Sequence, residues 1–307
     1  MTTVASDVHG FTAPGLERVA QLFGDGRDDL GRGGAAFCVS HGGEVVVDVW
    51  CGDAAPDRPW GGDTVSAVFS VTKGLVATCL ALLHDRGLLD PDEQVGTYWP
   101  GFSTDVTVRK MLSHQAGLIE VPGWSDLLRL DGTGWDRLPE IRRRLARAAP
   151  AWAPGSMHGY HVMTFGWLAG TLVELISGRP LARFFDEELA GPLGLDLRIG
   201  APDAVVPRMA TLLEPTRVPG PVGDAVEALL AVARDPQTLA GRACIAQDGG
   251  GCLDHLAVMG GSLVALRAGG GFGDGVGNAR SVSAFYAAVL DGRAGISRRS
   301  VDTFRAR

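Results

Sequence analysis

Ser70-Val71-Thr72-Lys73 leads directly into an apolar run, residues 74–83. Residues three apart on a helix lie on the same face, so a helix beginning here brings the Ser70 hydroxyl and the Lys73 amine together. Because the run that follows is apolar almost all round, this helix is predicted to be buried at the centre of the protein. A lysine buried beside a serine is costly unless it has partners or a task.

The scarcity of lysine supports a chemical role for this one. Of the 28 basic residues only Lys73 and Lys110 are lysines, and the others are arginines. Arginine keeps its proton in proteins, whereas a desolvated lysine can act as a base. The alternative interpretation is an N-capping serine followed by a solvated lysine.

The bulk composition limits the possible classes of protein. The 307 residues are enough for one large domain or two ordinary ones. A net charge of −7 argues against a nucleic-acid partner, and the arginine-rich run 142–147 is predicted to be the solvated face of a helix. The N-terminus lacks the pattern of a secretory signal, and no apolar run reaches membrane-spanning length. We therefore expect a cytoplasmic protein without membrane contacts.

The pattern along the chain predicts a small β element followed by a long, mainly helical region. Two β-rich runs, 35–40 and 44–50, surround the turn His41-Gly42-Gly43, which is typical of a hairpin. The central helix is expected to end near Gly87. Further helices are predicted at residues 14–23, 107–112, 135–149, 164–177, 181–189 and 281–290. Residues 200–275, rich in Pro and Gly, are expected to form loops with short helices, and no strands are predicted late in the chain.

Other catalytic patterns are weaker. The sequence has no G-x-S-x-G, HExxH or P-loop motif. His158 and His161 lack a third ligand, and the five cysteines form no CxxC pair, so neither a metal nor a cofactor is predicted. His114 is expected to be structural. The late glycine clusters could hold an anion, but no pattern places them at the start of a helix.

A serine hydroxyl needs a neighbour that takes its proton before it becomes a good nucleophile. Lys73 can do so if burial lowers its pKa. A second group must then pass a proton to the leaving group. Tyr160, one of three tyrosines, lies in a Gly-containing loop just before a helix, and such loops often carry functional side chains. From spacing alone, a core or interface tyrosine remains the simpler interpretation.

These residues carry a family resemblance. Ser70-Val71-Thr72-Lys73 resembles the SxxK motif of serine β-lactamases and penicillin-binding proteins. Residues 112–118 resemble the second landmark of that superfamily, and Gln115 within them is a candidate substrate-binding residue. The segment 152–199, with Gly159-Tyr160-His161, is most similar to the family VIII carboxylesterases.

The resemblance implies an α+β fold of the β-lactamase/transpeptidase type within a single domain, residues 1–307. Residues 1–69 and about 278–307 would form the α/β part, and residues 70–277 the mainly helical part. It also implies cleavage of a small-molecule ester through a Ser70 acyl-enzyme, with Lys73 and Tyr160 sharing the proton transfers and no cofactor. The oxyanion hole would use the backbone N–H of Ser70 and one from a late edge strand. No oligomeric state is predicted.

The sequence departs from the family pattern in two places. Val162 stands where the lactamases carry Asn, which favours an esterase over the alternatives, a β-lactamase or a D-alanyl peptidase. The family's closing strands and their Gly-Gly motif are not found, since Met259-Gly260-Gly261 precedes the late helix. We therefore expect a C-terminally truncated domain whose hairpin lacks its sheet neighbours. The alternative of another class is an inactive relative or a binding-only remnant.

Overall fold

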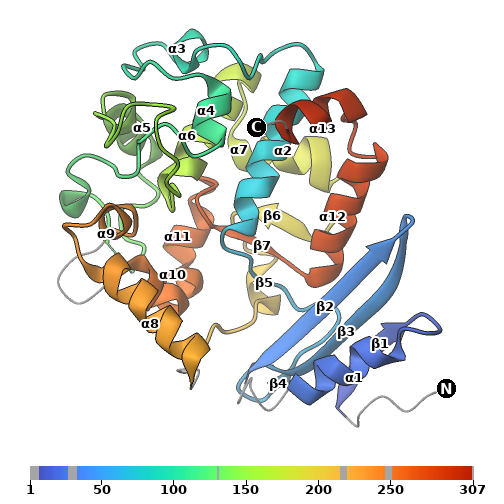
Figure 1. Cartoon of the computed structure of the whole chain (residues 1–307). Helices are drawn as coiled ribbons and strands as arrows, with labels where there is room; N and C mark the ends of the chain where they lie inside the picture. The colour runs from blue at the N-terminus through green and yellow to red at the C-terminus, as the bar shows by residue number, and fades with distance from the viewer. Residues whose placement is uncertain (1–6, 27–32, 130, 215–219, 246–250, 306–307) are drawn as a thin grey trace.

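The computed structural model describes residues 7–26, 33–129, 131–214, 220–245 and 251–305. Figure 1 shows helices gathered around the central helix α2 (Val71–Asp85), with a twisted sheet to one side. Helix α2 packs against α6 (Thr164–Ser177), α7 (Leu181–Phe185) and α13 (Arg298–Arg305). These contacts fix α2 within the helical part of the molecule, with Ser70 exposed at the start of the helix.

Burial of α2 is as predicted. Leu75, Val76, Cys79 and Leu80 have no exposed surface, and apolar side chains cover nearly the whole circumference of the helix. The helix ends at Asp85, and Gly87 follows in the left-handed conformation, with φ at 71°. Glycine adopts this conformation without a steric penalty, which explains the predicted end.

The N-terminal sheet confirms the predicted hairpin and adds to it. Strands β2 (Gly34–His41) and β3 (Glu44–Ala55) pair antiparallel, and β1 (Val8–Thr12) and β4 (Arg58–Pro59) also pair with β3. The expectation that the hairpin lacks sheet neighbours is therefore wrong on the β3 side. β1 is short and includes a glycine, so its sequence carries too little alternation to predict a strand.

A second sheet joins distant parts of the chain beside Ser70. Strands β5 (Ser66–Ala67), β7 (Gly275–Gly277) and β6 (Leu197–Ile199) form it in that order, all antiparallel. The expectation of no late strands is thus corrected by β7. Strands of two or three residues, one of them with two glycines, show no periodicity that could predict them.

The remaining helices follow the predicted order. α6 has the predicted bounds, and Gly178 caps it in the left-handed conformation. The other elements are α1 (Glu17–Asp25), α3 (Val95–Tyr98), α4 (Val108–Leu112), η2 (Trp124–Asp126), α5 (Leu138–Ala146), η3 (Asp186–Ala190), η4 (Val206–Arg208), α9 (Leu239–Ala243), η5 (Cys252–His255), α10 (Leu256–Gly261), α11 (Leu263–Arg267) and α12 (Ala279–Asp291). None of the helices in the described residues is both long and apolar enough to cross a membrane.

Helix α8 (Pro221–Arg234) is longer than the short helices expected in residues 200–275. Its proline stands in the first turn, where the missing N–H is no loss. Pro221, whose residue type suggested a loop, therefore begins a helix. The same stretch of chain continues through η5, α10 and α11, which line the candidate site.

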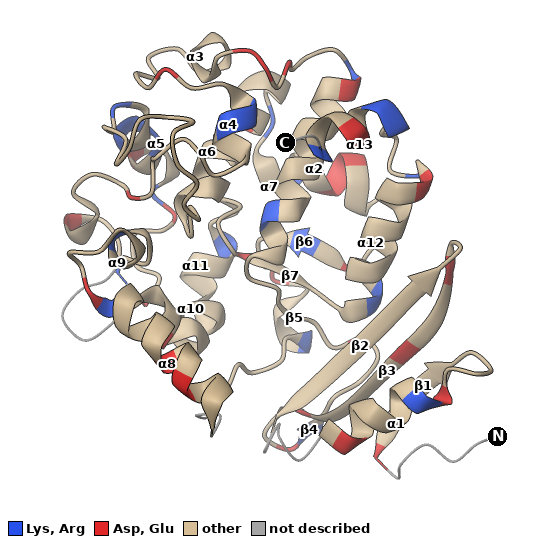
Figure 2. Cartoon of the chain, viewed as in Figure 1, with Lys and Arg blue, Asp and Glu red and all other residues tan. Residues whose placement is uncertain are grey.

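The arginine-rich run 142–147 lies on and after α5 and is ion-paired. Arg142 contacts Glu174 at 2.6 Å, and Arg144 contacts Asp126 at 2.7 Å. Figure 2 shows positive and negative residues interspersed along the helices, including α5. The charge of this run is therefore largely compensated within the chain.

Candidate active site

Ser70 is the N-cap residue of α2, and the turn before it is tightly held. Phe69 has a φ of 42°, a conformation that bulky residues rarely adopt. Its carbonyl accepts hydrogen bonds from both the amide (2.9 Å) and the hydroxyl (2.5 Å) of Thr72, and that hydroxyl accepts one from the Gly275 amide of β7 at 2.9 Å. The turn thus anchors the exposed Ser70 side chain at the N-terminal end of the helix.

Lys73 lies one helical turn after Ser70 and reaches back to it. Its Nζ is 3.1 Å from Ser70 Oγ, 2.6 Å from the carbonyl oxygen of Val162 and 3.2 Å from that of Phe272. The residue is only 7% exposed. Three acceptors from three separate segments therefore surround one nitrogen, which confirms the predicted proximity of the Ser70 and Lys73 side chains.

The surroundings of Lys73 favour its neutral form. Burial lowers the pKa of Lys73 from 10.5 to about 8, and the nearby Cys252 and Asp274 partly oppose this shift. With a pKa of about 8, roughly a tenth of the amine is unprotonated at pH 7. The lysine can therefore accept a proton under ordinary conditions.

The late glycine cluster holds an anion, and that anion belongs to the chain itself. The carboxylate of Asp274 is 1% exposed and accepts hydrogen bonds from the amides of Gly270 (2.7 Å) and Gly271 (3.0 Å). Burial raises its pKa to about 6, against the opposing effect of these bonds. The loop that the carboxylate organises presents the Phe272 carbonyl to Lys73. The sequence analysis did not identify Asp274 or the Phe272 carbonyl as parts of the site, although Asp274 directly follows the glycine cluster.

Tyr160 lies beside the lysine, so the structure brings together all three predicted catalytic residues. The Nζ of Lys73 is 5.1 Å from the centre of the Tyr160 ring. The ring is 46% exposed and contacts the imidazole of His114, with 4.8 Å between ring centres. The tyrosine is thus near both the buried amine and solvent.

Gln115, the predicted substrate-binding residue, is engaged elsewhere. Its side-chain amide donates a hydrogen bond to Ser113 Oγ at 2.8 Å, and its backbone oxygen accepts one from the Gly155 amide at 3.0 Å. It is not among the residues that line the cavity next to Ser70. A role in substrate binding stays a prediction.

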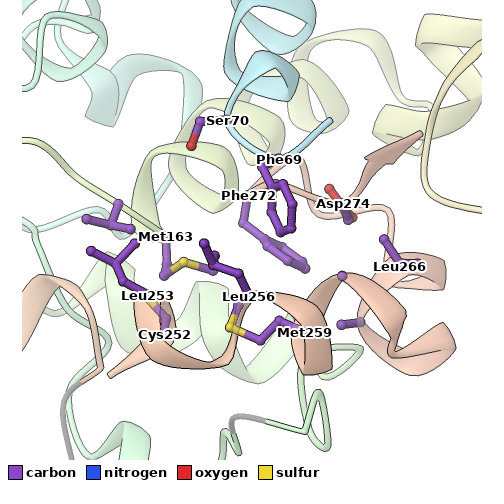
Figure 3. Close-up of a pocket in the computed structure, with 14 residues that line it drawn as sticks. Phe69, Ser70, Met163, Cys252, Leu253, Leu256, Met259, Leu266, Phe272 and Asp274 are labelled. Carbon is purple, nitrogen blue, oxygen red and sulfur yellow. The ribbon is translucent and has the colours of Figure 1, made fainter. Parts of the chain in front are cut away.

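A cavity of about 250 Å³ opens beside Ser70 (Figure 3). Its walls are mostly apolar side chains, from Phe69, Val162, Met163, Leu253, Leu256, Met259, Leu266 and Phe272. Of the lining residues that the structure describes, Asp274 alone is charged, and its carboxylate accepts hydrogen bonds from the glycine amides. The cavity can therefore enclose an uncharged, apolar group next to the serine. Among the described residues, no group of three or more His, Cys, Asp or Glu is arranged to hold a metal ion.

An α+β fold with a serine and a lysine at the start of its central helix defines a class that includes β-lactamases and penicillin-binding proteins. The model of the Beta-lactamase family matches residues 19–307, and the chain belongs to this family. The resemblance inferred from the sequence is thereby confirmed.

Curated relatives include esterases. The esterase/β-lactamase LipL of Mycobacterium tuberculosis is 40% identical over 193 residues, which is 60% of this chain and 43% of LipL. Esterase EstB of Burkholderia gladioli is 33% identical over 185 residues, 53% of this chain and 45% of EstB. The matched regions span less than half the length of these relatives.

Solved structures match over most of the chain and confirm the α+β fold. A family VIII carboxylesterase is similar with a TM-score of 0.72 and 31% identity, over 93% of this chain and 72% of that one. A penicillin-binding protein homologue from Caulobacter crescentus is similar with a TM-score of 0.75 and 33% identity, over 96% of this chain and 76% of that one.

Proposed function

We propose that this chain is a serine hydrolase that cleaves small carboxylic esters through an acyl-enzyme on Ser70. The observation that carries the proposal is the position of Lys73 Nζ, 3.1 Å from Ser70 Oγ with two backbone carbonyls on its other sides. Similarity to esterases supports the same class of activity.

The contacts of Lys73 suit a base. In its neutral form the amine has two N–H groups and one lone pair. The carbonyls of Val162 and Phe272 take the two N–H groups, so the lone pair faces Ser70 Oγ. As the oxygen attacks the ester carbonyl carbon, its proton moves to Lys73. The negative charge that develops on the carbonyl oxygen lies near the N-terminus of α2, where the helix dipole stabilises it.

Tyr160 completes the proton transfers in this proposal. Its phenol gives a proton to the departing alkoxide and regains one from protonated Lys73, which lies against its ring. Water then attacks the acyl carbon while Lys73 takes its proton. The bond to Ser70 Oγ breaks, the protonated Lys73 returns that proton to the serine oxygen, and the acid product leaves. The half-exposed position of Tyr160 lets the alcohol leave toward solvent.

The cavity favours an ester over the two alternative substrates. β-Lactams and D-alanyl peptides carry a carboxylate, which proteins usually bind with Arg or Lys. Among the described residues that line this cavity, none is an Arg or a Lys. An uncharged acyl group can instead bury its apolar surface against Leu253, Leu256 and Met259.

The test compares a short-chain chromogenic ester with a chromogenic cephalosporin. We expect the ester to be turned over faster, and Ser70→Ala to lower ester turnover by about 10⁴-fold or more. Ser66→Ala is the matched control, because Ser66 lies in β5 and lines a different cavity. Turnover that survives Ser70→Ala would contradict the proposal. A folded chain without any turnover would favour the binding-only alternative.

A further inference from the structure

His114 occupies an unusual position next to the proposed catalytic tyrosine. It follows α4 with a φ of 62°, in the left-handed region. Its imidazole is packed among the rings of Tyr160, Phe165 and His161, with ring centres at 4.8, 5.0 and 5.4 Å. A non-glycine residue in this conformation is uncommon, and such positions concentrate at functional sites.

Two hydrogen bonds tie His114 to the backbone on either side of Tyr160. The amide of Gly159 donates to the His114 carbonyl oxygen at 3.1 Å. The amide of His161 donates to the His114 ring nitrogen Nδ1, also at 3.1 Å. The residues before and after the tyrosine are therefore both anchored on one residue, while the His114 ring lies against the tyrosine ring itself.

We propose that His114 is the positioning residue of Tyr160 and holds the tyrosine ring beside Lys73. Its Nδ1 accepts the His161 amide, its backbone carbonyl accepts the Gly159 amide, and its imidazole packs against the tyrosine ring. The inference rests on the proposed function, in which Tyr160 transfers protons. It differs from a purely structural role, because removal of His114 should affect the reaction through Tyr160.

The chemistry of the imidazole fits positioning and excludes a role as the base. Nδ1 accepts a hydrogen bond, so the ring proton of the neutral form is on Nε2. Burial lowers the pKa of His114 to about 3, and His161, Lys73 and His158 contribute to the same shift. The ring therefore stays neutral at the pH where esters are hydrolysed. The neutral imidazole keeps Nδ1 as a hydrogen-bond acceptor and places no positive charge beside Lys73.

The need for an anchor follows from the surroundings of the tyrosine. Its ring is half-exposed, and the loop before it contains Gly155 at a φ of 87° as well as Gly159. A displacement of about 1 Å in a proton-transfer group can lower the rate by about 10²-fold. The position of Tyr160 must then be fixed by packing and by its neighbours, and His114 contributes one contact with the tyrosine ring and one hydrogen bond to each adjacent residue.

The test is a pair of matched variants, His114→Asn and His114→Gly. Both residues tolerate the left-handed backbone, and both remove the imidazole ring. Asn keeps a side-chain acceptor near the position of Nδ1, whereas Gly does not. Steady-state kinetics with the chromogenic ester give kcat and KM. Amide hydrogen exchange at His161 reports the anchoring bond independently of activity.

For His114→Gly we expect kcat to fall by about 10- to 10²-fold, with KM within about twofold of the unmodified chain. Exchange of the His161 amide should rise about tenfold. His114→Asn should recover most of both effects. In a Tyr160→Phe background, His114→Gly should have almost no further effect on kcat, because both changes act on one group.

Three results would overturn the positioning role: full kcat in His114→Gly, no recovery in His114→Asn, or full additivity with Tyr160→Phe. Failure of the proposed function would look different. The unmodified chain would then show no ester turnover, and His161 exchange in the two variants would still decide whether His114 anchors the tyrosine segment.

Discussion

The two sides of the cavity are built in different ways. The polar side combines Ser70 and Lys73, one helical turn apart, with the carbonyls of Val162 and Phe272. These carbonyls come from distant parts of the chain and accept hydrogen bonds from Lys73. The apolar side includes one continuous stretch, η5 and α10, which contributes Leu253, Leu256 and Met259. In this proposal the polar side carries out the reaction and the apolar side binds the acyl group. The polar side depends on specific atoms at specific distances, whereas the apolar side depends on buried area, so changes on the two sides should have unequal effects.

Apart from loss of the serine itself, the largest effect is expected from Lys73→Arg. Arginine keeps the positive charge but cannot give up its proton, so the general base is lost. Turnover of the ester should fall by about 10²- to 10⁴-fold. Lys110→Arg is the matched control, because it changes the chain's other lysine, exposed on α4, and should leave kcat within about twofold. Equal kcat in the two variants would show that Lys73 serves only as a charge.

The pH dependence of kcat/KM sharpens the same point. Only neutral Lys73 accepts a proton, and burial lowers its pKa to about 8. Below that value kcat/KM should fall about tenfold per pH unit, and above it the profile should level off. The Asp274 carboxylate raises the pKa of Lys73, so Asp274→Asn should move the midpoint to lower pH. A flat profile between pH 6 and 9 would contradict Lys73 as the base.

The smallest effect is expected on the apolar side. Leu256→Ala removes buried contact area, and each buried methylene contributes about 0.8 kcal/mol, or about fourfold in binding. The variant should lower kcat/KM several-fold for an ester with a medium-length acyl chain and leave an acetate ester nearly unchanged. Val258→Ala is the control, because Val258 lies on the same helix but is exposed and outside the cavity lining. A uniform loss on both esters would place the acyl chain elsewhere.

The sequence predicted those parts of the site that depend on local pattern or residue type. Ser70 and Lys73 could be paired because the helix period fixes their spacing and lysine is rare in the chain. Tyr160 required the family resemblance, since one tyrosine in a loop has no distinguishing spacing. The catalytic assignments of all three remain proposals, while their proximity is a feature of the structure.

The remainder depends on contacts that residue types do not encode. Any residue can present a backbone carbonyl, so no pattern pointed to Val162 or Phe272 as partners of Lys73. His114 was expected to be structural. Its link to Tyr160 is visible only in the folded chain, where the loop after α4 contacts the loop before α6. Likewise, β6 and β7 have three residues each, too few for a period. Long elements such as α2 and α6 were predicted, because each repeats its pattern over several turns.

The most direct test of the Ser70 acyl-enzyme is mass spectrometry after rapid acid quenching of the protein during ester turnover. We predict a mass increase equal to the acyl group, located on the peptide that contains Ser70 and absent in Ser70→Ala. An acylated peptide from another part of the chain, or an adduct that persists in Ser70→Ala, would contradict the mechanism.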